Sequence, residues 1–104
     1  SEEELAAIRT RLENDDLTVR AYRFAGDRIC QSARFETYSK ALGDRFEPRV
    51  LADDAANPDV APFFSDHVPF PHSVVTQHLI DGAGQPTLGA RDEILAFFVQ
   101  RLSA

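Results

Sequence analysis

Hydrophobic residues recur at helical spacing near both ends of the chain. Ser1 and three glutamates precede apolar residues at positions 5, 8 and 12, which predicts a capped amphipathic helix over residues 1–14. A second apolar stripe predicts a final helix over about residues 88–102, whose apolar face should cover a sheet. That stripe consists of Ile94, Leu95, Phe98 and Leu102.

The segment after the first helix has the pattern of a βαβ unit, residues 17–52. Apolar and polar residues alternate over residues 17–25, which predicts a strand, and residues 46–52 predict a second one. Between them we expect a helix with Ser32 as its cap and Gly43 at its end. A crossover of this kind joins parallel neighbours, so the two strands should be parallel.

The rest of the chain is less regular. Residues 53–71 contain four prolines and little periodicity, which predicts a long loop, and such loops are usually functional or mobile. Residues 73–80 are rich in β-branched residues and favour a third short strand, with a helix as the alternative. The fold class is therefore α/β. Residues 1–104 form a single unit, divided into a leading helix (1–14), the βαβ unit (17–52), a histidine-bearing loop (53–71), and a short strand with the C-terminal helix (72–104).

Composition narrows the possible partners. Of the 104 residues, 43% are hydrophobic and 27% are charged, as in ordinary globular domains. A formal charge of -6 without any cluster of Lys or Arg argues against nucleic acid and against anionic membranes as partners. No apolar run approaches the roughly 20 residues of a membrane span, and no signal-peptide pattern is present. One cysteine, Cys30, allows no internal disulfide, so we expect a cytoplasmic protein.

Asp27 and His72 could form an acid–base pair. Asp27 follows the first predicted strand, and open α/β sheets place functional groups at the carboxyl ends of their strands. His72 ends the proline-rich loop, so the fold could bring its imidazole to Asp27 and leave Nε2 to act as a general base. Simpler interpretations exist, because Gly26 and Asp27 are common turn residues and loop histidines are often only solvated. His67 is the competing histidine.

Two other kinds of site are disfavoured. Cys30 could be a nucleophile, but no Gly-x-Cys-x-Gly elbow surrounds it, so a packing role is the simpler interpretation. A metal site could use His67, His72, His78 and a carboxylate such as Asp66, but these residues lack the spacing typical of metal ligands. We therefore expect no metal site, and we expect no cofactor because triad chemistry uses none.

Several stretches of the sequence resemble dienelactone hydrolase-like proteins, a family of α/β-hydrolases. The resemblance covers nearly all of the chain. The stretches are L-T-V-R-A-Y-R-F-A-G-D-R (17–28), A-R-F-E-T (33–37), A-L-G-D-R-F (41–46), P-H-S-V-V-T-Q-H-L-I-D (71–81), Q-P-T (85–87) and D-E-I-L-A-F-F (92–98).

The resemblance implies that this chain is the C-terminal part of an α/β-hydrolase fold. In that family a Ser or Cys nucleophile comes first in the sequence, an Asp follows a late strand and a His follows the last strand; Asp27 and His72 match the last two. The sequence contains no Gly-x-Ser-x-Gly or Gly-x-Cys-x-Gly elbow and no Gly-rich oxyanion loop. We therefore expect this chain alone to be inactive, and the completed protein to hydrolyse a small-molecule ester or lactone.

Two further expectations concern assembly. An unpaired apolar strand edge is a template for another chain, so we expect a homodimer formed through the strand over residues 17–25. The alternative function is a free-standing, non-catalytic interaction or assembly module on the same scaffold.

Overall fold

The computed structural model of the protein describes residues 1–102 and shows a mixed α/β fold. Strands β1 (Val19–Phe24) and β2 (Phe46–Leu51) pair in parallel, which confirms the predicted βαβ unit. The helices are α1 (Glu2–Asn14), α2 (Ser32–Leu42), α3 (Pro62–His67) and α4 (Pro86–Leu102), with single 3-10 turns η1 (Gly43–Arg45) and η2 (Asp53–Ala55).

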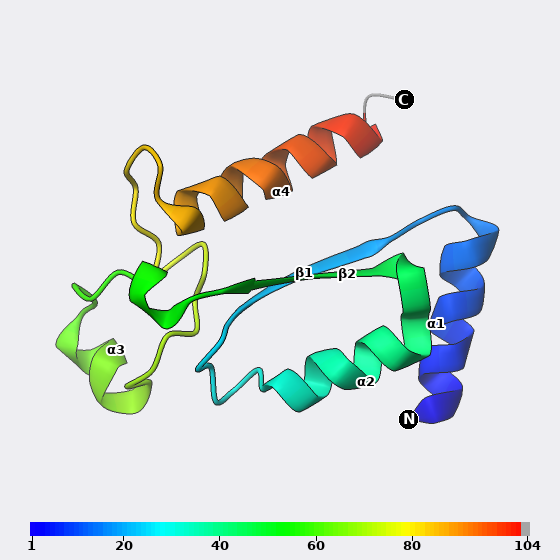
Figure 1. Cartoon of the computed structure of the whole chain (residues 1–104), viewed down its shortest axis with the longest axis horizontal. Helices are drawn as coiled ribbons and strands as arrows, with labels where there is room; N and C mark the ends of the chain where they lie inside the picture. The colour runs from blue at the N-terminus through cyan, green and yellow to red at the C-terminus, as the bar shows by residue number, and fades with distance from the viewer. Residues whose placement is uncertain (103–104) are drawn as a thin grey trace.

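Helices lie on both faces of this two-stranded sheet (Figure 1). On one face, α1 and α2 bury a cluster of large apolar side chains against β2. The cluster consists of Leu12, Phe35, Leu42 and Phe46. On the other face, a second cluster lies around the end of β1, buried by the start of α4 and by the segments after β2. This cluster consists of Phe24, Ala55, Val74 and Ala90. The sheet therefore separates two small cores.

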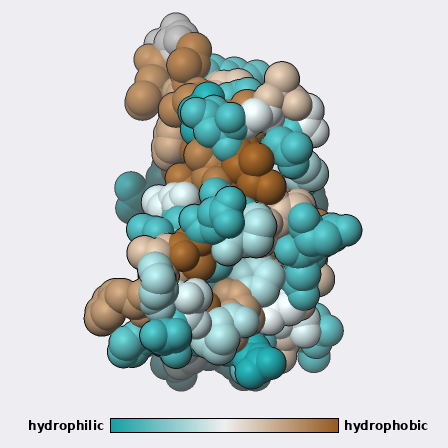
Figure 2. All heavy atoms as spheres, turned by 90° about the vertical axis from the view of Figure 1, so that its left-hand side faces the viewer, coloured by the Kyte–Doolittle hydropathy of each residue, from teal (hydrophilic) through white to brown (hydrophobic). Residues whose placement is uncertain are grey.

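The carboxyl ends of β1 and β2 lie at the same end of the molecule, because the strands are parallel. The loop after β1, the turn η2, helix α3 and the segment over residues 68–85 gather at this end, on the left of Figure 1. Figure 2 looks onto this end and shows apolar groups between polar ones. The candidate site lies here.

The ends of the helices match the prediction in two of three cases. Ser1 caps α1 as predicted, since its Oγ accepts a hydrogen bond from the Glu4 amide at 3.2 Å. Gly43 ends α2 with a φ of +59°, a conformation that favours glycine. The prediction of Ser32 as the cap of α2 is wrong: Ser32 is the first helical residue, and the backbone carbonyl of Gln31 accepts the first hydrogen bond, from Arg34 at 3.0 Å.

The predicted third strand over residues 73–80 is also wrong, and so is the helical alternative. The segment forms consecutive turns, in which the His78 amide donates to the Ser73 carbonyl at 3.0 Å and the Leu79 amide donates to Thr76 at 3.2 Å. Other backbone groups of the segment bond to Asn57 and Thr87, and no strand ladder forms with β1 or β2. The β-branched residues divide instead, with Val74 buried and Val75 exposed.

The loop over residues 53–71 has more local structure than its sequence predicted. It contains η2 and the six-residue helix α3. Pro62 is the first residue of α3, where a proline fits because the first backbone amides of a helix have no intrahelical partner.

The expectation that the apolar stripe of α4 covers the sheet is wrong for most of its length. Phe98 is 54% exposed and Leu102 is 82% exposed. The sheet face beneath this part of α4 carries charged side chains, and Glu93 of α4 forms ion pairs with Arg20 and Arg49 there. No helix in residues 1–102 is long and apolar enough to cross a lipid bilayer.

Candidate functional site

Asp27 is buried in the turn that follows β1. Its side chain is only 1% exposed, and its Oδ1 accepts hydrogen bonds from the backbone amides of Ile29 at 2.8 Å and Cys30 at 3.1 Å. Aspartate readily forms such bonds to amides two and three residues further on, which is why it is common in turns. Here the turn leaves the second oxygen, Oδ2, for another partner.

Arg23 supports this turn from inside the protein. Its guanidinium is buried and donates to the backbone carbonyls of Cys30 at 2.8 Å and Ala25 at 3.0 Å. The Arg23 Cζ also lies 5.7 Å from the ring centre of Phe35. Because the planar guanidinium holds its donors in a fixed fork, these bonds fix the two ends of the turn relative to each other.

Asp53 holds the same turn from the end of β2. Its Oδ1 accepts a hydrogen bond from the Gly26 amide at 2.7 Å. A Cβ atom at position 26 would overlap the Asp53 carboxylate in its present position, so the glycine permits this close approach. The acid-bearing turn is thus attached to both strands.

The structure brings His72 to Asp27. The His72 Nδ1 lies 2.6 Å from Asp27 Oδ2, although the two residues are 45 positions apart in the chain. An ionised carboxylate only accepts hydrogen bonds, so Nδ1 carries the proton, and the neutral ring has its lone pair on Nε2. The His72 side chain is 33% exposed, and within residues 1–102 its Nε2 makes no hydrogen bond, so this nitrogen is available for proton transfer.

His78 supports the segment that carries His72. The His78 ring is buried, and its Nδ1 accepts hydrogen bonds from the backbone amides of His72 at 3.1 Å and Ser73 at 2.9 Å. Nδ1 is therefore unprotonated, and a neutral His78 carries its proton on Nε2, opposite to His72. Burial is the main cause that lowers the pKa of His78 below 6.5, and the positive charge of a protonated His72 lowers it further, against the opposing effect of Asp27.

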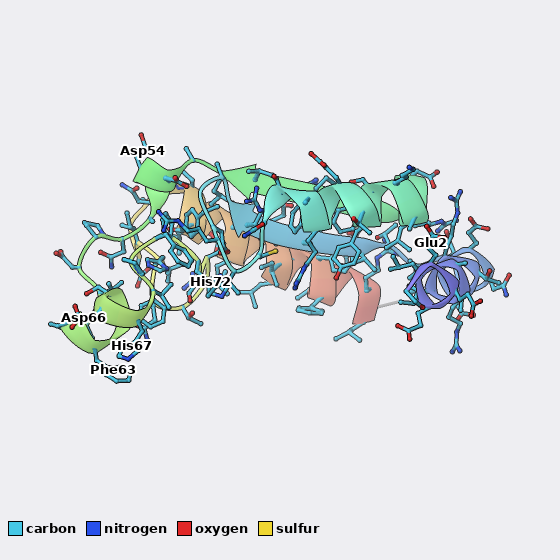
Figure 3. The ribbon with its side chains drawn as sticks, turned by 90° about the horizontal axis from the view of Figure 1, so that it is seen from below. Glu2, Asp54, Phe63, Asp66, His67 and His72 are labelled. Atoms are coloured by element: carbon cyan, nitrogen blue, oxygen red, sulfur yellow. The ribbon has the colours of Figure 1, made fainter. Side chains whose placement is uncertain are left out.

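His67 does not join this site. It ends α3 on the outer side of the molecule, close to Phe63 and Asp66 and apart from His72 (Figure 3). Its Nδ1 lies 2.8 Å from the Phe63 carbonyl oxygen, and the two rings are 4.7 Å apart. The structure thus places His72, and not His67, beside Asp27.

The remaining sequence candidates also have defined places. Cys30 is partly buried; its amide binds Asp27 and its side chain packs against the cluster beneath α2. Among residues 1–102, no group of three or more His, Cys, Asp or Glu side chains is arranged to hold a metal ion.

The arrangement is that of a base held by a buried acid. Asp27 can orient the His72 ring, fix its tautomer and stabilise the imidazolium that forms when Nε2 takes up a proton. Sequence reasoning selected both of these residues but missed the supporting side chains of Arg23, Asp53 and His78. Of these, only Asp53 carried a usable signal, since it follows a predicted strand just as Asp27 does.

Comparison of the chain with protein-family models, with curated proteins and with solved structures found no match.

Proposed function

We propose that Asp27 and His72 are the acid and the base of an ester- or lactone-hydrolysing site, and that this chain is the C-terminal portion of a dienelactone hydrolase-like α/β-hydrolase. The observation that carries the proposal is the 2.6 Å contact between His72 Nδ1 and the buried Asp27 carboxylate. It lies at the carboxyl end of a parallel strand, the position that α/β enzymes use for functional groups.

In this proposal His72 Nε2 transfers the proton. It removes the proton from the hydroxyl or thiol of the nucleophile as that group attacks the carbonyl carbon, and then gives it to the leaving alcohol oxygen. Asp27 keeps its negative charge throughout and stabilises the imidazolium. In the second half of the reaction, the same nitrogen takes a proton from the water that attacks the acyl carbon, and returns it to the nucleophile as the acyl–nucleophile bond breaks and the carboxylic acid leaves.

The attacking group is expected from residues outside these 104. The sequence has no nucleophile elbow, and within residues 1–102 no serine or cysteine side chain is hydrogen-bonded to His72. Donors for an oxyanion are expected from the same missing part. This chain alone should therefore show no esterase activity, and the substrate would be a small ester or lactone.

The experiment uses the whole product of the gene. We expect it to hydrolyse short p-nitrophenyl esters or simple lactones, and Asp27→Asn and His72→Gln to lower kcat by about 10³-fold or more, as loss of a triad member does. His67→Gln is the matched control and should retain full activity. Unchanged turnover in the His72→Gln protein, or equal losses in His67→Gln, would refute the assignment.

A second candidate function is a non-catalytic interaction module. It is favoured by the edge of β1, which pairs only with β2 among the described residues, and by the open groove beside that edge. The gene distinguishes the two functions. A reading frame that continues upstream of Ser1 into a Gly-rich loop and a nucleophile elbow supports the hydrolase, and a start codon at this point supports the module.

A further inference from the structure

His78 is hydrogen-bonded to the backbone that carries His72, the proposed base. A single ring nitrogen, Nδ1 of His78, accepts hydrogen bonds from two consecutive amides, those of His72 at 3.1 Å and Ser73 at 2.9 Å. These amides lie on either side of the His72 Cα, which carries the imidazole. These two bonds therefore hold the peptide groups on either side of the His72 Cα in place.

The backbone of His78 is itself fixed on both sides. Its amide donates to the Ser73 carbonyl at 3.0 Å, which closes the turn around the ring. Its carbonyl accepts from the Asn57 amide at 2.8 Å, and the Asn57 side chain donates to the Leu79 carbonyl at 3.1 Å. Asn57 follows η2, so the turn is attached to the segment that leaves β2.

The His78 ring is also held in place by two aromatic neighbours. Phe24, the last residue of β1, is fully buried and meets the ring edge-on at 6.0 Å between ring centres. Phe64 of α3 meets it at 5.4 Å. Phe24 is three residues before Asp27 in the chain, so the His78 ring relates the base-bearing turn directly to the strand that carries the acid.

We propose that His78, in its neutral form with the proton on Nε2, is a positioning residue that holds His72 in the orientation that meets Asp27. This inference rests on the proposed function and adds a residue to it. A doubly protonated ring has no lone pair on Nδ1, so it would release both amides and with them the His72 backbone. The titratable groups facing the ring are His72 and Asp27.

The test uses NMR of the 104-residue chain, which has only three histidines. In the wild type, ¹⁵N spectra should show the proton of His72 on Nδ1 and that of His78 on Nε2. His78→Phe keeps the ring and removes the acceptor; we expect the His72 Nδ1 proton signal to be lost and the exchange protection of the His72 and Ser73 amides to fall at least tenfold. His78→Asn places an oxygen the same number of bonds from Cα as Nδ1, and should restore both readouts. His67→Phe is the control and should change neither.

A folded His78→Phe chain that retains the His72 signal and both protected amides would overturn the proposal. If His78→Phe does not fold, His78→Asn decides it: a folded chain with the signal supports it, and a folded chain without the signal overturns it. Titration of the wild type needs no substitution. The amide resonances of His72 and Ser73 should shift with the same midpoint as the His78 ring, and independent midpoints would contradict the proposal. Because these readouts do not depend on turnover, they are separate from a failure to find hydrolase activity.

Discussion

At the scale of single residues, Gly26 and Asp53 lie so close together that a side chain at position 26 would have to displace the Asp53 carboxylate. The Gly26 amide donates to the Asp53 carboxylate at 2.7 Å, and an added Cβ would overlap that carboxylate. We therefore expect Gly26→Ala to lower the free energy of unfolding by about 0.5–1.5 kcal/mol, because the exposed Asp53 carboxylate must move and its hydrogen bond to the amide of residue 26 is lost. Urea denaturation followed by circular dichroism would measure the loss.

The matched control for this substitution is Asp53→Ala, alone and combined with Gly26→Ala. If the overlap is the cause, the double variant should be less destabilised than the sum of the two single variants, because removing the carboxylate makes room for the new methyl group. Strict additivity would show that Gly26 matters for another reason.

The burial of neutral His78 makes stability depend on pH. Its pKa in the folded protein lies below 6.5, so as the pH falls through about 6.5 the unfolded chain takes up a proton that the folded chain does not. The contribution of His78 to the free energy of unfolding is therefore fully present above this pH. It decreases as the pH falls towards the lowered pKa, by at most about 1.4 kcal/mol per pH unit. We expect His78→Asn to show a shallower loss between pH 7 and 5 in parallel urea titrations. Identical slopes would contradict this.

The two residues at the centre of the site could be selected from the sequence because their positions follow from topology. Asp27 follows β1 and His72 ends the long loop that returns to the same end of the sheet. The supporting roles of Arg23 and His78 could not be predicted, since both act through hydrogen bonds to backbone groups. Such bonds depend on how the turns fold and leave no pattern of residue types.

At the scale of elements, a carboxylate of α4 links this helix to the charged face of the sheet, in addition to the burial of Ala90 against Phe24. Glu93 accepts hydrogen bonds from the Tyr22 hydroxyl at 2.8 Å and from Arg49 Nε at 2.9 Å, and it lies 3.4 Å from Arg20. The Tyr22 hydrogen bond is the main cause that lowers the pKa of Glu93, while desolvation opposes it. The apolar stripe further along α4 remains exposed, so this contact has few apolar neighbours to support it.

We expect Glu93→Gln to destabilise the fold by about 1 kcal/mol, a small effect because the side chain is 40% exposed and screened by water. The loss should be greatest where Glu93 is ionised and should shrink in acid, as the lowered pKa of Glu93 is passed. Thermal unfolding at pH 7 and pH 4 would measure both. Asp92→Asn is the control, since among residues 1–102 the Asp92 side chain is ion-paired with its neighbour Arg91 alone.

The elements that the sequence predicts well are those with a strong local pattern. The alternation over β1 and the glycine at the end of α2 mark the βαβ unit, and the Ser1 cap marks the start of α1. The prediction of a third strand was wrong because β-branched residues are also compatible with turns. Here the turn is stabilised by the buried ring of His78, which belongs to the same segment. The prediction that the apolar stripe of α4 covers the sheet was wrong because this helix faces charged side chains of the sheet. Those side chains come from residues far away in the sequence.

At the scale of the whole molecule, one surface is open beside β1. Among residues 1–102 the sheet consists of β1 and β2 alone, so each strand has one edge without a strand partner; β2 contains Pro48, which has no amide to donate, whereas β1 contains no proline. A groove of about 1080 Å³ lies alongside, with apolar side chains from α1, β1 and α2 in its walls, including Ile8, Val19 and Ala33. Such an edge is a template for pairing with another strand.

We therefore predict that this chain forms homodimers through β1. Sedimentation velocity should show association that increases with concentration, and Val19→Lys should prevent it by placing a charge in the groove. Val50→Lys is the matched control, because Val50 is an exposed apolar residue of the other strand. A wild-type chain that remains monomeric at high concentration would rule the dimer out.

The distance in sequence between Asp27 and His72 also links chemistry to folding. The two side chains meet only when a loop of more than forty residues has closed, and loop closure costs entropy that local structure cannot offset alone. A peptide that contains only Asp27 or only His72 could not form the contact between the two side chains. In the proposed hydrolase, substitutions far from the site that loosen the sheet would thus reduce the fraction of molecules in which His72 meets Asp27, and would resemble catalytic defects although they act on folding.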